Sequence, residues 1–97
     1  MNSDREPLPP LADAVERVAA SVVGLVTRRQ RGAGVVWRAG VAVGSASALW
    51  RASSVAVVLP SGEQVDGAVR GLDASTDLAV VSFADRGVPA VERAAEV

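Results

Sequence analysis

The sequence of 97 residues contains no histidine and no cysteine. Without cysteine the chain can form no disulfide, no thiolate nucleophile and no cysteine-ligated metal site. Without histidine it lacks the commonest general base, and a transition-metal site would have to be built from carboxylates alone. We therefore expect neither a metal nor a cofactor.

A large excess of charge of either sign is also lacking, because ten basic residues stand against eleven acidic ones. Such a chain does not attract nucleic acid or an anionic membrane through its overall charge. The longest apolar run, 18–26, is interrupted by Ser21 and Gly24 and is too short to cross a bilayer. The acidic, proline-rich start does not have the order of a secretory signal. We expect a soluble, by default cytoplasmic, protein that binds neither nucleic acid nor membrane.

Aromatic residues make up only 3% of the chain, whereas the apolar fraction reaches 49% and consists mostly of valine and alanine. A single domain of this size buries one modest core, and β-branched side chains favour strands. The prolines and alternating charges of residues 1–10 predict a flexible leader. Residues 11–20 carry apolar side chains at three- and four-residue spacing, which predicts a short amphipathic helix.

From Ser21 onward the hydrophobic period becomes two, which predicts short strands separated by turns. The predicted strands cover 21–28, 33–38, 41–45, 54–59, 64–72 and 78–83, and a helical turn is expected over 46–52. Gly67 and Gly71 stand where a bend or bulge would curl the longest strand. The pattern predicts a closed all-β barrel over residues 21–85, followed by a tail over 86–97.

Four motifs follow one another along the chain. They are Ser-Val-Val at 21–23, Gly-Ala-Gly-Val-Val at 32–36, Val-Val-Leu-Pro-Ser-Gly at 57–62 and Gly-Leu-Asp-Ala-Ser-Thr-Asp-Leu-Ala-Val-Val at 71–81. The last is the most specific. Over residues 15–83 the chain resembles the amino-terminal barrel of HtrA-type, trypsin-like serine proteases. The resemblance implies a single six-stranded antiparallel Greek-key barrel with a short N-terminal helix.

The resemblance also implies positions for two members of a catalytic triad. Asp77 matches the aspartate that orients the catalytic histidine in this family. The family's Thr-Asn-x-His-Val segment falls on residues 44–48, so that Ser47 stands at the histidine position. A serine hydroxyl cannot act as a general base near neutral pH. We interpret Asp77 as a residue that shapes the turn before the last strand, where it can still share a hydrogen bond with Ser47.

The third triad member and the oxyanion hole belong to the second barrel of this family, in a Gly-x-Ser-Gly-Gly loop that this sequence does not contain. The serines that are present lack both a base and an oxyanion-forming glycine loop. We therefore expect no intact catalytic site and no enzymatic activity from the chain as it stands.

Two further features are candidates for binding. The run Arg28-Arg29-Gln30-Arg31 could be a small anion-binding loop, although we favour a solvated hairpin turn. Trp37 and Trp50 could be interface anchors, although a tryptophan in a chain this poor in aromatic residues more often fills the core or covers a barrel end, so we favour the core for both.

Three functions compete. The first, which we expect, is a catalytically inactive pseudoprotease module that binds a protein partner or itself through an apolar barrel face. The second is the N-terminal part of a split or truncated HtrA-like serine endopeptidase. The third is an unrelated small β-barrel binding module of the SH3-like or OB type. Six strands in Greek-key order, with Asp77 facing Ser47, would exclude the third.

Overall fold

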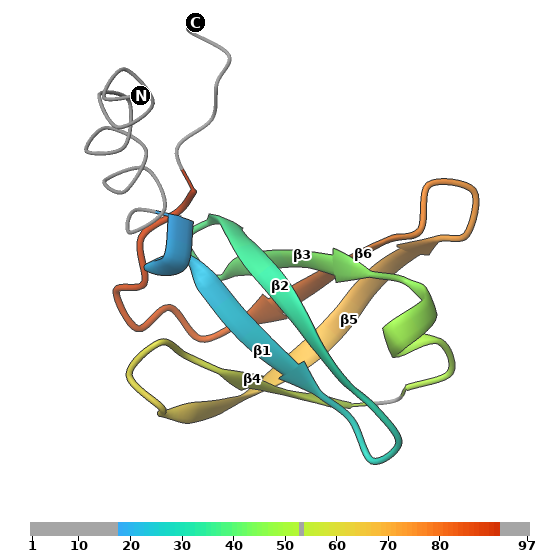
Figure 1. Ribbon diagram of the computed structural model, residues 1–97, viewed down its shortest axis with the longest axis horizontal. Helices are drawn as coiled ribbons and strands as arrows, with labels where there is room; N and C mark the ends of the chain where they lie inside the picture. The colour runs from blue at the N-terminus through green and yellow to red at the C-terminus, as the bar shows by residue number, and fades with distance from the viewer. Residues whose placement is uncertain (1–17, 53, 92–97) are drawn as a thin grey trace, which may run out of the picture.

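The computed structural model describes residues 18–52 and 54–91, and in them six strands close into an antiparallel barrel (Figure 1). The elements are β1 (Val22–Val26), β2 (Arg31–Arg38), β3 (Val41–Ser45), the 3-10 helix η2 (Ser47–Leu49), β4 (Val55–Val58), β5 (Gln64–Asp73) and β6 (Leu78–Phe83). Around the barrel their order is β1-β2-β3-β6-β5-β4. Because β4 returns to lie beside β1, the first four strands form a Greek key. The predicted all-β, six-stranded antiparallel barrel is confirmed.

The strands lie where the period of two predicts them, with ends shifted by a few residues. The largest differences are at the first hairpin, where β1 ends at Val26 instead of residue 28 and β2 begins at Arg31 instead of residue 33. The turn between them lies two residues earlier than expected because Thr27 closes it: its backbone N–H donates to the Gln30 carbonyl oxygen, and its hydroxyl oxygen accepts from the Gln30 N–H at 3.1 Å. The helical turn expected over 46–52 is present as η2.

The predicted leader lies outside the described residues, and the predicted helix and tail are only partly covered by them. Residues 1–17 lie outside them, as do 92–97 of the predicted tail. Residues 18 and 19 are helical and Ala20 is in a turn. Across the part of the chain that the structure describes, no helix is long and apolar enough to span a membrane.

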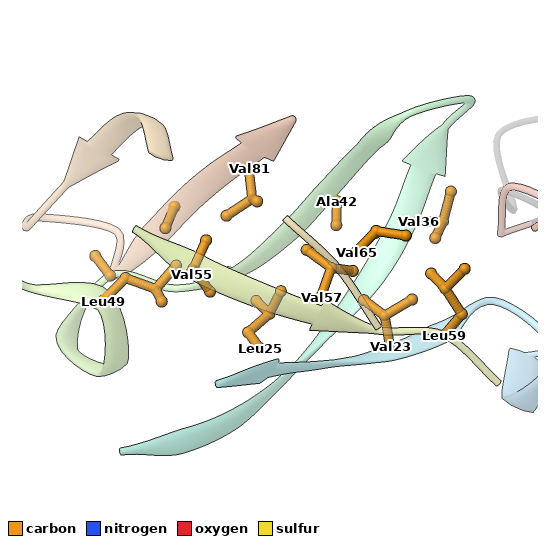
Figure 2. Packing of buried hydrophobic residues seen from close by; sticks show 12 residues of the cluster. Val23, Leu25, Val36, Ala42, Leu49, Val55, Val57, Leu59, Val65 and Val81 are labelled. Carbon is orange, nitrogen blue, oxygen red and sulfur yellow. The ribbon is translucent and has the colours of Figure 1, made fainter. Parts of the chain in front are cut away.

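The core lies inside the barrel and is built from small aliphatic side chains (Figure 2). Its buried members are Val23, Leu25, Val36, Ala42, Ala46, Leu49, Val55, Val57, Leu59, Val65, Ala79 and Val81. Gly34 and Gly44 are paired across β2 and β3, and the side chain of Leu25 fills the space in front of them. A Cβ atom on Gly34 would lie 2.8 Å from Leu25 Cδ1, so the close packing requires glycine there.

The interpretation of the two tryptophans as core residues is wrong. Trp37 is 43% exposed and Trp50 is 57% exposed. A barrel interior filled by valine and leucine has no room for an indole ring. Trp37 also follows the completely buried Val36, and because successive side chains of a strand point to opposite faces, it points outward. The predicted bulge in β5 is present, between Val69 and Gly71.

Candidate functional site

The candidate site lies where β3 ends and β6 begins. Ser45, the last residue of β3, is paired with Leu78, the first residue of β6. This register places Asp77 beside the start of η2 and therefore beside Ser47. Asp77 adopts a left-handed backbone conformation with φ of 58°. Aspartate tolerates that conformation better than most residues, so the chain can turn sharply into β6.

Asp77 is bound to the η2 segment by both its side chain and its backbone. One carboxylate oxygen, Oδ1, accepts from the Ser47 backbone N–H at 2.9 Å, and the other, Oδ2, accepts from the Ser45 hydroxyl at 2.9 Å. Its backbone carbonyl oxygen accepts from the Ala46 N–H at 3.1 Å. The Ser47 N–H, followed by the Ser45 hydroxyl, lowers the pKa of the Asp77 carboxyl below its ordinary value.

The three side chains form a directed chain of hydrogen bonds. The hydroxyl oxygens of Ser45 and Ser47 are 2.8 Å apart. A serine hydroxyl has one proton, and that of Ser45 is donated to Asp77. Ser47 is therefore the donor to Ser45, and the chain runs from Ser47 through Ser45 to the carboxylate. The expected contact between Ser47 and Asp77 is thus made by the Ser47 backbone N–H, while its hydroxyl reaches Asp77 through Ser45.

This arrangement is suited to holding the chain in place and poorly suited to acid–base chemistry. A carboxylate with a lowered pKa is a weaker base than an ordinary one, and both of its oxygens already accept hydrogen bonds. Across residues 18–52 and 54–91 no cluster of acidic side chains is placed to hold a metal ion. The network can orient η2 relative to the β5–β6 hairpin, and it offers no group of suitable basicity to activate a serine.

A shallow hollow of about 370 Å³ opens over this network. Ser47 and Asp77 line it together with Ala46, Trp50 and Ala74. The exposed indole of Trp50 thus forms part of the rim instead of the core. Sequence reasoning brought Ser47 and Asp77 together correctly, but it missed Ser45 and did not connect Trp50 with them. Ser45 could have been suspected from the sequence because it lies in the segment 44–48, two residues before Ser47.

Comparison with known proteins agrees with the motif resemblance. No family model and no curated protein matches this chain. Among solved structures the chain is similar to the serine endoprotease from Yersinia pestis, with a TM-score of 0.76 and 27% sequence identity over 81% of this chain. The match covers 31% of the Yersinia chain, so this chain spans less than a third of its length. In motifs, strand order and three-dimensional fold, the described barrel resembles the trypsin-like barrel of an HtrA-type serine protease, as the sequence predicts.

Proposed function

We propose that the chain is a catalytically inactive, trypsin-like barrel that serves as a protein-interaction or self-association module. The observation that carries this proposal is the hydrogen-bond chain from Ser47 through Ser45 to Asp77. By motif, Ser47 stands at the histidine position of the family and Asp77 at the triad aspartate. With no histidine anywhere in the sequence, the carboxylate has no imidazole to orient and acts as a tether for η2.

The face that we assign to binding is a row of four valines on the outside of the barrel. Val22 is paired with Val35, Val35 with Val43, and Val43 with Val80. Directly paired residues point to the same side of a sheet. Their chain neighbours, such as Val23, Val36, Ala42 and Val81, are buried inside, so this valine row points outward.

The valine row is a continuous apolar surface across four strands. Val22 and Val80 are 37% and 38% exposed, and Leu78, two residues before Val80 and hence on the same face, is 49% exposed. On the opposite side of the barrel the outer positions are mixed in character, since Val58 is paired with Gln64 and Ala56 with Asp66. Contiguous exposed apolar surface of this kind marks interaction sites on soluble proteins.

Sedimentation velocity over a range of protein concentrations tests the proposal. The wild-type chain should associate as its concentration rises, whereas Val80→Asp should stay monomeric because a carboxylate in the valine row opposes its burial. Gln64→Asp, which adds the same charge on the opposite side, should associate like the wild type. Circular dichroism checks that each variant is folded. A wild-type chain that stays monomeric at high concentration would contradict the self-association.

The second candidate is the N-terminal part of a split or truncated HtrA-like endopeptidase. It is favoured by the match to less than a third of the Yersinia protein, and disfavoured by the serine at position 47. Labelling by a fluorophosphonate, which reacts with activated serines, distinguishes the two functions. Labelling of a second barrel only when this chain is present would support the endopeptidase. The proposed module predicts no labelling with or without this chain.

A further inference from the structure

A second and larger hollow, of about 920 Å³, lies between the β1–β2 hairpin and the segment that follows η2. The hairpin supplies Arg28 and Arg29, and the other wall supplies Trp50, Arg51 and Ser54. Figure 1 shows this hairpin projecting from the barrel near η2 and the start of β4. The two walls meet where β2 begins, since a Cβ atom on Gly32 would lie 3.3 Å from the Ala48 Cβ.

The lining of this hollow is strongly positive in a chain whose net charge is −1. Three arginines line it, and no acidic side chain does so among the described residues. The described part of the chain contains one ion pair, between Arg86 and Glu63, and both of these residues lie outside the hollow. The guanidinium groups of the hollow therefore have no carboxylate partner in the described barrel.

The backbone holds these arginines in defined places. In the hairpin, the Thr27 hydroxyl oxygen accepts from the backbone N–H groups of Arg29 and Gln30 at 3.3 and 3.1 Å. On the other wall, the Ala52 N–H donates to the Leu49 carbonyl oxygen and closes the end of η2. Arg51, within that turn, has a φ of 64°. This left-handed conformation is one that glycine adopts more easily, so arginine is not the residue that the backbone favours there.

We propose that this hollow binds an acidic peptide segment of a partner protein. Guanidinium groups bind carboxylates through paired, charge-assisted hydrogen bonds, and the exposed face of Trp50 supplies apolar contact for the peptide. A peptide fits better than a nucleic acid because the positive charge is confined to the hollow, whereas nucleic-acid binding requires a broad basic surface and several aromatic platforms. The proposal does not depend on the valine row, which shares no residue with the hollow.

The test uses a blocked peptide of about eight glutamates, which spans roughly 26 Å when extended. Titration at low salt, where the Debye length is about 30 Å, is followed by tryptophan fluorescence and calorimetry. Binding should be saturable, should weaken as salt is added, and should be absent for a glutamine peptide of the same length. The fluorescence change should be lost in Trp50→Phe, because Trp50 lines the hollow and Trp37 does not.

Three arginine variants test where the peptide binds. The double variant Arg28→Gln and Arg29→Gln should weaken binding by about tenfold or more, and Arg51→Gly by about threefold to fivefold, as loss of charge-assisted hydrogen bonds predicts. Arg38→Gln removes one positive charge outside the hollow, as Arg51→Gly removes one inside it, and should change binding by less than about twofold. Because glycine suits the backbone at position 51, Arg51→Gly should melt at the same temperature as the wild type or higher.

Several outcomes would overturn the proposal. One is a loss with Arg38→Gln as large as that with Arg51→Gly, which would mean that binding follows net charge alone, because each of these variants removes one positive charge. Another is equal affinity for the glutamate and glutamine peptides. A third is tighter binding of an oligothymidylate of the same length than of the glutamate peptide, which would assign the hollow to nucleic acid. Unchanged binding in both Arg51→Gly and the hairpin double variant would place the peptide elsewhere.

Discussion

The β5–β6 hairpin carries two exposed aspartates, one at the end of β5 and one just before β6, whose side chains make contacts of very different range. The Asp73 carboxylate accepts hydrogen bonds from the backbone N–H and the hydroxyl of Ser75, at 3.0 and 2.8 Å, only two residues along the chain. The Asp77 carboxylate accepts from Ser45 and Ser47, which are 32 and 30 residues away. Asp73 therefore closes its own turn, while Asp77 joins two separate parts of the barrel.

The pKa values do not distinguish these two aspartates. The pKa of Asp73 is lowered mainly by the Ser75 hydroxyl, and that of Asp77 mainly by the Ser47 backbone N–H. A lowered pKa thus reports that donors surround a carboxylate, and it does not report whether those donors are local or distant. The identity of the donors shows that only the second carboxylate positions η2.

Besides its hydrogen bonds to Asp77, η2 is held to the barrel by the buried side chain of Leu49. We expect the largest loss of stability from substituting this residue. Leu49 is completely buried, so Leu49→Ala should lower the free energy of unfolding by about 2–5 kcal/mol. Leu78→Ala, at a half-exposed position next to Asp77, should cost about 1 kcal/mol or less. Urea denaturation of both variants checks this. Equal losses would mean that η2 is not held by burial of Leu49.

Substitution of the two aspartates tests directly whether Asp77, unlike Asp73, holds two separate segments together. Asp77→Ala should lower the denaturation midpoint more than Asp73→Ala does, because it removes hydrogen bonds between distant segments and also places alanine in the left-handed conformation of position 77. It should also speed amide hydrogen exchange, most at Ser47, whose N–H donates to the Asp77 carboxylate, and less at Ala46, whose N–H donates to the backbone carbonyl oxygen that alanine retains. Asp73→Ala should leave exchange at these two amides unchanged. Equal exchange rates in the two variants would contradict the assignment of Asp77 as a tether.

The pH dependence of stability sharpens the comparison further. The pKa of Asp77 in the folded chain lies below its ordinary value of 3.8, so its ionised form favours folding. This contribution is complete above about pH 5 and is lost as the pH falls through 3.8 and then through the lower folded-state pKa. The stability gap between wild type and Asp77→Ala should therefore narrow over that range, as urea titrations at each pH would measure. A stability difference that widens as the pH falls would contradict the conclusion that the ionised Asp77 favours folding.

The strands were predictable because each is a short run with a hydrophobic period of two between clear turn residues. The pairing of Asp77 with the segment around Ser47 was also predictable, since a specific motif identifies Asp77 and the place of the family's histidine segment along the chain identifies Ser47. The hydrogen bond of Ser45 to Asp77 was not predictable, because it depends on the pairing of Ser45 with Leu78. No local pattern determines the register of strands so far apart in the sequence. The exposure of the tryptophans depends on the volume available inside the barrel, which composition alone does not give.

The clustering of Arg51 with Arg28 and Arg29 was not predictable either. The hairpin run is visible in the sequence, but the second wall of the hollow is brought to it by the barrel closure that pairs β1 with β4. Residues that are unremarkable along the chain can thus form a charged surface once the fold is complete.

The most direct test of the account is the pKa of a histidine introduced by Ser47→His, measured by proton NMR. The natural chain has no histidine, so its ring signals are free of overlap with other imidazoles. If position 47 and Asp77 correspond to the triad histidine and aspartate, the carboxylate should raise the imidazole pKa relative to the same substitution combined with Asp77→Asn. The fold should be retained, and the single variant alone should cleave no peptide. Equal pKa values in the two backgrounds, or peptide cleavage by Ser47→His alone, would contradict the account.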